Sequence, residues 1–150
     1  MKRFISLFAA AAVAILSVSG CYTESTEALY SIIFSIGNQH EYFRTGSEEA
    51  EKALDEIKTN VNAFTKSSAA EWKETIKNKD FSSADASAKA RYESVLAEFK
   101  KLETESKAKI AALPTGLPAT IDYTWNIKLE RWAPDGNSAD LDKYSFTITY

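Results

Sequence analysis

Apolar and polar residues alternate most regularly in about the last thirty residues of the chain. From Ile121 to Leu129 the odd-numbered residues are apolar or aromatic and the even-numbered ones polar; from Tyr144 to Tyr150 the even-numbered residues are the apolar ones. A period of two is typical of strands that bury one face. Because the loop Ala133–Asn137 between them contains proline and glycine, the two segments are predicted to form a hairpin.

One register of this hairpin places an apolar residue opposite every inward apolar residue. In this register Leu129 lies opposite Tyr144, and every second residue along the two strands forms a further apolar pair. A slip by one residue would break all of these pairs. The same register sets Trp132 opposite Leu141, on the face that is otherwise polar. We interpret Trp132 and Leu141 as an apolar spot and a candidate surface for a partner. The alternative is that Trp132 packs against the loop alone.

The segment from Thr45 to Asn78 has the period of an amphipathic helix. Its first residues offer hydroxyl caps and acidic side chains, and apolar residues then recur every three or four positions. The phase drifts across Thr65–Ser68 and resumes with Trp72 and Ile76. We predict one long helix, or two collinear pieces with a kink, that ends near Asn78.

A second helix is predicted from a cap at Ser82 or Ser83 to Leu113, where Pro114 ends it. A mean spacing of about 3.5 residues between apolar positions is the seam of paired helices. The two helices are therefore expected to pack as an antiparallel hairpin. The predicted seam consists of Ala88, Tyr92, Val95, Phe99, Leu102, Ser106 and Ile110.

The remaining strand comes first in the predicted domain. Leu29–Ile36 is rich in β-branched and aromatic residues and is partly apolar on both faces, which is typical of a strand that lies inside a sheet or is covered on both sides. The elements follow the order β-α-α-β-β, an α+β fold in which a three-stranded, largely antiparallel sheet packs on a long antiparallel helical hairpin. Residues 29–150 are long enough to form one domain without disulfides or metals.

The N-terminus has the pattern of an export signal. Two basic residues precede an apolar run from Phe4 to Val18, which is shorter than the roughly 20 residues that a membrane-spanning helix needs. The run ends in the sequence Val-Ser-Gly-Cys, and Cys21 is the only cysteine of the chain. This ending resembles the lipobox of bacterial lipoproteins. The alternative is an ordinary secretory peptide that is cut elsewhere and leaves Cys21 as a stray thiol.

The resemblance implies that residues 1–20 are removed as a signal peptide and that the sulfur of Cys21 is diacylated, with acylation of the new amino group left open. More than one acyl chain is needed because a single acyl chain of the size of myristoyl holds a protein only marginally on a membrane. Residues 21–28 then form a short lipidated tether, since the eight steps from Cys21 to Leu29 reach at most about 29 Å. We expect the domain to lie at the membrane surface of the cell envelope.

The resemblance also bears on which membrane is used. Tyr22 is not the aspartate that retains many lipoproteins in the inner membrane, so the outer membrane is expected in a host that has two. In a host with one membrane, the outer face of the plasma membrane is expected.

The charge of the chain argues against some partners. It contains 18 basic and 21 acidic residues, and removal of residues 1–20 takes away two basic ones, so the net charge changes from −3 to −5. Nucleic-acid binders concentrate positive charge, and adhesion to anionic headgroups needs a polybasic segment. We expect no nucleic acid as a partner, and the lipid on Cys21 as the only membrane contact.

No catalytic or metal-binding arrangement stands out in the sequence. His40 is the only histidine, so a Ser-His-Asp site would have to use it, and lone loop histidines are more often solvated. The chain has no thiol cluster for a metal and no glycine cluster for phosphate. Paired carboxylates could act as acid and base, but the solvated faces of two helices explain the acidic residues better. We expect no enzyme activity, no metal and no cofactor.

Two functions fit this sequence. The first is a non-enzymatic protein-binding or accessory module near the membrane surface, with Trp132 and Leu141 as its candidate surface. The second is a carrier or sensor for a lipid or saccharide, which needs a cavity of roughly 300 Å³ or more, lined by Tyr123 and Trp125. The period-two placement of these aromatic residues favours a packed core, so the first hypothesis is the better supported.

Overall fold

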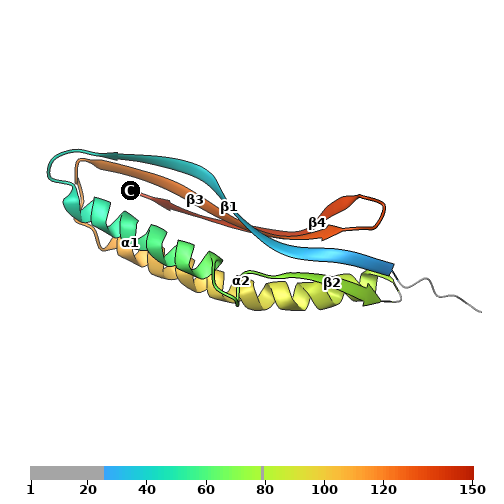
Figure 1. Cartoon of the computed structure of the whole chain (residues 1–150). Helices are drawn as coiled ribbons and strands as arrows, with labels where there is room; N and C mark the ends of the chain where they lie inside the picture. The colour runs from blue at the N-terminus through green and yellow to red at the C-terminus, as the bar shows by residue number, and fades with distance from the viewer. Residues whose placement is uncertain (1–25, 79) are drawn as a thin grey trace, which may run out of the picture.

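A computed structural model describes residues 26–78 and 80–150; Cys21 and the predicted signal peptide lie outside them. These residues form one antiparallel sheet in the order β2-β1-β3-β4. Both helices lie on one face of it, and none of the described residues forms a helix on the other face, which we call the open face (Figure 1). The elements are β1 (Thr26–Phe43), α1 (Glu48–Thr65), β2 (Lys73–Asn78), α2 (Phe81–Ala111), β3 (Ala119–Trp132) and β4 (Ser138–Thr149).

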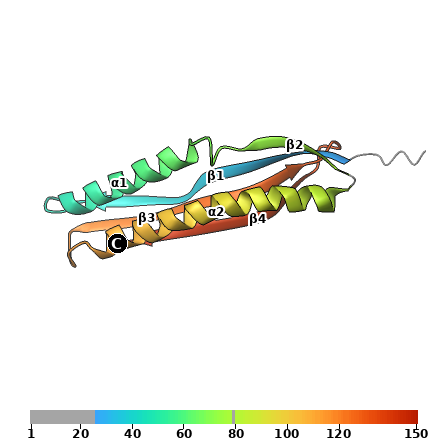
Figure 2. The same cartoon turned by 90° about the horizontal axis from the view of Figure 1, so that it is seen from below.

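The domain is long and narrow, and α2 runs along most of its length (Figures 1 and 2). The 31 residues of α2 span about 46 Å at 1.5 Å per residue. α1 and β2 occupy successive stretches along the side of the domain away from β4 (Figure 2). The sheet therefore has four strands at the end where β1 begins and three at the other end.

The α+β class is confirmed, but the three-stranded sheet and the continuous helical hairpin are wrong. α1 ends at Thr65, and the residues predicted to continue it form β2, which pairs with Thr26–Ser31 of β1. Trp72 and Ile76 lie four residues apart, which satisfies a helical period. Ile76 is also the only apolar residue of β2, so no alternating pattern indicates a strand. The pairing of this segment with β1 makes it a strand, and the local pattern of apolar residues gives no information about that pairing.

The cap of α2 is Asp80, two residues before the first of the two predicted caps, Ser82 and Ser83, and the buried seam is as predicted. The carboxylate of Asp80 accepts a hydrogen bond from the Ser83 amide at 2.7 Å, and this bond lowers the pKa of Asp80. Of the seven predicted seam residues of α2, six are buried and Leu102 is half-buried.

The core lies between the sheet and the helices and is centred on a cluster of phenylalanine rings. Phe99 of α2 is fully buried. Its ring centre lies 5.7 Å from that of Phe34 on β1, 6.2 Å from that of Phe64 on α1 and 5.0 Å from that of Phe146 on β4. One side chain therefore joins four elements.

β3 and β4 form the predicted hairpin with the predicted faces, but the register differs by two residues. Ile127 pairs with Tyr144, whereas Leu129 was predicted opposite Tyr144. A shift of two keeps every side chain on its face, so the buried pattern does not distinguish the two registers. Leu141 is an extra residue of β4 between the partners of Leu129 and Glu130, and it forms a bulge.

Candidate functional site

The structure does not pair Trp132 with Leu141. Trp132 lies opposite Ser138, stands on the open face and is 45% exposed. Leu141 is the bulged residue of β4 and packs against the buried core. Trp132 therefore lies on the face of the sheet that was predicted, whereas Leu141 is partly buried and offers little area to a partner.

Trp132 is instead a neighbour of the first strand. It pairs with Leu29 of β1, and Leu29 and Ile33 are half-buried on the same open face. Two shallow hollows border the indole, one on the side of Pro134 and one on the side of Ile33. We call the surface formed by Leu29, Ile33 and Trp132 the Trp132 patch.

A nearly buried carboxylate holds the indole in place. Trp132 Nε1 donates a hydrogen bond to Glu130 Oε2 at 2.7 Å, and Lys128 Nζ donates to Glu130 Oε1 at 3.0 Å. Glu130 is only 8% exposed, so its charge needs these donors. Lys128 also donates to Asp140 at 2.9 Å, and the hydrogen bonds to Asp140 and Glu130 raise the pKa of Lys128. A ring fixed in this way loses little rotamer freedom when a partner covers it.

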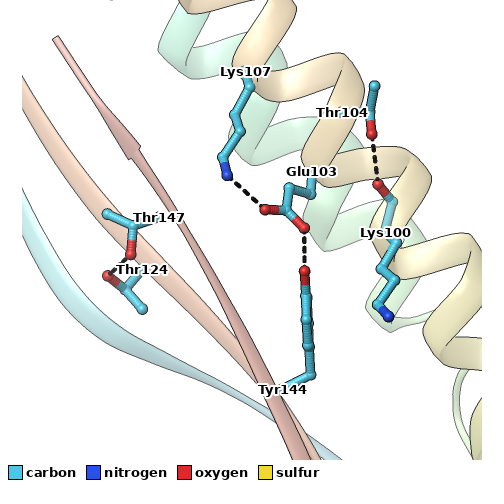
Figure 3. Close-up of polar contacts among 7 residues, drawn as sticks. All are labelled: Lys100, Glu103, Thr104, Lys107, Thr124, Tyr144 and Thr147. Atoms are coloured by element: carbon cyan, nitrogen blue, oxygen red, sulfur yellow. Dashed lines mark hydrogen bonds and ion pairs between the residues drawn. The ribbon is translucent and has the colours of Figure 1, made fainter.

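The neighbouring part of the open face is polar, and many of its side chains bond to one another. The hydroxyls of Thr124 and Thr147 lie 2.8 Å apart across β3 and β4 (Figure 3). The amide nitrogen of Asn126 donates to Ser35 at 3.3 Å. The Trp132 patch is therefore an apolar exception on a hydrogen-bonded polar surface.

Tyrosines on the opposite face tie the sheet to the helices. The Tyr144 hydroxyl donates to Glu103 Oε2 at 2.5 Å, and Lys107 Nζ donates to Glu103 Oε1 at 2.6 Å (Figure 3). Burial opposes ionisation of Glu103, but the hydrogen bonds from Lys107 and Tyr144 outweigh it and lower the pKa. The same hydrogen bond raises the pKa of Tyr144. Both oxygens of this carboxylate are engaged, so we interpret the cluster as a structural link between α2 and β4.

His40 lies within β1 opposite Asp122, and not in the loop that was predicted. Its side chain is exposed. Across residues 26–78 and 80–150, no three histidine, cysteine or acidic side chains come together as metal ligands would. In the same residues, no helix combines the length and the apolar character that crossing a bilayer requires.

The hollow beneath the aromatic sheet face is small. Tyr123 and Trp125 are buried, and their ring centres lie 5.4 Å apart in a stacked arrangement. The hollow that touches Trp125 has a volume of about 140 Å³, below the roughly 300 Å³ at which ligand sites begin. Among the described residues, the hollow beside Trp125 is therefore smaller than the cavity that the carrier hypothesis requires there.

The sequence identified Trp132 as an outward residue but did not show which residues of the first strand lie beside it. Leu29 and Ile33 were visible as apolar positions on the second face of the first strand, but their proximity to Trp132 depends on the β1–β3 register. The contact from Glu130 to the indole had no signal in the sequence. No protein family, curated protein or solved structure matches the chain.

Proposed function

We propose that the protein is a non-enzymatic envelope lipoprotein, anchored through Cys21, that binds another protein through the Trp132 patch. The observation that carries the binding function is the fixed orientation of Trp132 beside Leu29 and Ile33 on an otherwise polar face. Tryptophan is enriched among the residues that dominate binding energy at protein interfaces. The anchor is supported by the lipobox at residues 18–21.

The position of the patch supports a partner close to the membrane. β1 begins at Thr26, three residues before the predicted start of the domain. Five steps from Cys21 to Thr26 reach at most about 18 Å. Leu29 and its partner Trp132 lie at this same end of the sheet. A lipid on Cys21 would therefore keep the patch near the bilayer, at the outer membrane if the host has two membranes.

We expect Cys21→Ala to abolish lipid attachment and to leave the signal peptide on the chain. The thiol is the group that accepts the diacylglyceryl group, and the alanine side chain has no atom that can replace it. Palmitate labelling and mass spectrometry measure both effects. Ser17→Ala, outside the lipobox, is the matched control and should be processed normally. A processed Cys21→Ala protein whose mass differs from that of the wild type only by the replaced side chain would refute the anchor.

We expect Trp132→Ala to weaken partner binding about 30-fold, since an interface tryptophan of this kind contributes about 2 kcal/mol. Crosslinking in intact envelopes, followed by purification, should recover one stoichiometric protein with the wild type and lose it with the variant. Tyr42→Ala is the control, because Tyr42 is 50% exposed on the same face at the other end of β1. Recovery of the same protein in the same yield from Trp132→Ala would exclude the patch.

A further inference from the structure

We propose that the outer edge of β1 at Phe34–Ile36 accepts an extended strand of the protein partner, with one apolar side chain of that strand in the adjoining hollow. This inference rests on the proposed protein-binding function. It specifies the form of the partner's binding segment and adds a second contact to the Trp132 patch.

β1 has a strand on both sides only near its beginning. β3 pairs with it as far as Phe43, but β2 pairs only with Thr26–Ser31. The next contact on that side is the Ile32 amide, which donates to the Trp72 carbonyl at 3.0 Å. Beyond it, in the part of the chain that the structure describes, no strand pairs with this side of β1.

Main-chain groups of the unpaired stretch point outward. Successive residues of a strand direct their N–H and C=O groups to opposite sides. Since the amide of Ile32 points away from β3, those of Phe34 and Ile36 do so as well. Both residues thus offer a donor and an acceptor, and such groups are normally paired with main chain, side chain or water. A row of them is a template for another strand.

A hollow of about 140 Å³ opens beside this edge, between β1 and α1. Ile36 is 52% exposed at its rim. An apolar cavity of about 150 Å³ accommodates a benzene ring, so the hollow has room for one apolar side chain. In strand addition the main chain supplies affinity and such pockets supply specificity. The lining includes Phe34, Ile36, Val61, Thr65, Phe99 and Trp125.

The other two edges of the sheet carry charges that discourage strand pairing, which is the usual protection of an edge. In contrast, Ile33–Gln39 contains no charged residue. The bulge at Gly37–Asn38 bends the edge and limits the accepting stretch to the residues before it. The charges lie at Lys73, Glu74 and Lys77 in β2 and at Asp140, Asp142 and Lys143 in β4.

A second copy of this chain fits the edge less well than a separate strand. The β1 edges of two copies would pair about a two-fold axis. If that axis passed between Phe34 and Ile36, residues 38–43 of one copy would collide with β2 of the other. An axis farther along would pair the irregular Gly37–Asn38 segments of both copies. A single partner strand that ends opposite Ile33 avoids both conflicts.

A library of random nine-residue peptides tests the proposal on the full chain, purified in the form in which the cell carries it. Selected peptides should alternate apolar and polar residues and bind with a Kd below about 100 μM. Ile36→Lys places a charge at the rim of the hollow and should weaken the best peptide at least tenfold. The control Tyr42→Lys changes a residue of similar exposure beyond the bulge and should leave binding unchanged.

Two further measurements separate strand pairing from a contact of side chains alone. N-methylation of those main-chain nitrogens of the best peptide that face β1, which are every second one, should abolish binding. The unmodified peptide should slow hydrogen exchange of the Phe34 and Ile36 amides. Failure to select any peptide, or equal binding to Ile36→Lys, would overturn the proposal. A dimer that sediments as such and dissociates in Ile36→Lys would assign the edge to a second copy.

The two binding surfaces can fail independently. If crosslinking recovers a partner that Trp132→Ala loses and Ile36→Lys retains, the strand proposal is wrong and the proposed function stands. If the partner is lost only with Ile36→Lys, the Trp132 patch is wrong and the strand proposal is supported.

Discussion

Phe99→Ala is expected to lower the free energy of unfolding by about 3–5 kcal/mol, the range for a large aromatic residue removed from a core. Phe99 is fully buried, and its ring contacts those of Phe34, Phe64 and Phe146. The cavity would therefore lie where β1, α1 and β4 meet α2. Because small domains are stable by only about 5–15 kcal/mol, this loss is a large part of the total free energy of unfolding. Urea denaturation followed by circular dichroism measures the difference.

Phe99→Leu is the control for this prediction. It keeps most of the buried volume, so the expected loss is below about 1.5 kcal/mol. A loss below about 1 kcal/mol for Phe99→Ala would mean that the surrounding rings collapse into the space and that no single residue links the four elements.

The sequence was sufficient for the strands whose one-sided pattern repeats over several residues. In β3 and β4, alternation from Ile121 to Leu129 and from Tyr144 to Tyr150 predicts both strands and their buried faces. It does not determine the register, because shifts by two residues preserve every face. The bulge at Leu141 makes the observed register possible, and no residue preference marks this position.

β2 shows where local patterns are insufficient. Its six residues contain one apolar side chain, and the segment follows a helix whose period it happens to continue. The strand exists because Thr26–Ser31 offers an edge to pair with, a contact between segments far apart in the chain. The same reasoning explains the candidate site. The outward phase of Trp132 followed from its position in β3, but Leu29 and Ile33 became its neighbours only through the β1–β3 register.

The free edge of β1 follows from the mismatch in length between β1 and β2. β1 has 18 residues and β2 has six, so β2 covers the first third of β1 and leaves the stretch that follows unpaired. The Trp132 patch lies on the open face at the covered end, and the accepting edge lies immediately beyond it. A partner that engaged both would lie along the outer side of β1, over the end of the domain at which β1 begins.

Asp85 on α2 links two sheet residues, and its loss should be the second most costly change. The Tyr30 hydroxyl donates to Asp85 Oδ1 at 2.7 Å, and Arg131 NH1 donates to Oδ2 at 2.6 Å. Tyr30 is fully buried, and the side chains of Asp85 and Arg131 are each 21% exposed. The carboxylate therefore joins the first turns of α2 to β1 and β3.

Asp85→Ala is expected to lower the free energy of unfolding by about 2–3 kcal/mol at neutral pH. It leaves a buried hydroxyl and a largely buried guanidinium without their acceptor, and partial exposure keeps the cost below that of a fully buried pair. Glu98→Ala is the matched control on the same helix. Its ion pair with Lys101 is mostly exposed and should contribute less than about 0.5 kcal/mol.

The cost of Asp85→Ala should depend on pH in a direction that identifies Tyr30. Burial, and next the hydrogen bond to Asp85, raise the pKa of Tyr30 above its ordinary value of about 10. The folded state thus binds the proton more tightly than the unfolded state, so this contribution to stability is complete below pH about 10 and is lost as the pH rises above it. Asp85→Ala removes only the part of the shift that comes from Asp85 and leaves the part that comes from burial. The stability difference from the wild type should therefore stay constant up to the pKa that Tyr30 has in the variant and should narrow above it. Burial also raises the pKa of Tyr92 to about 12, but that tyrosine is present in both proteins and cancels in the comparison. Urea denaturation at a series of pH values measures the difference, and a gap that widens as the pH rises above about 10 would contradict the role of Tyr30.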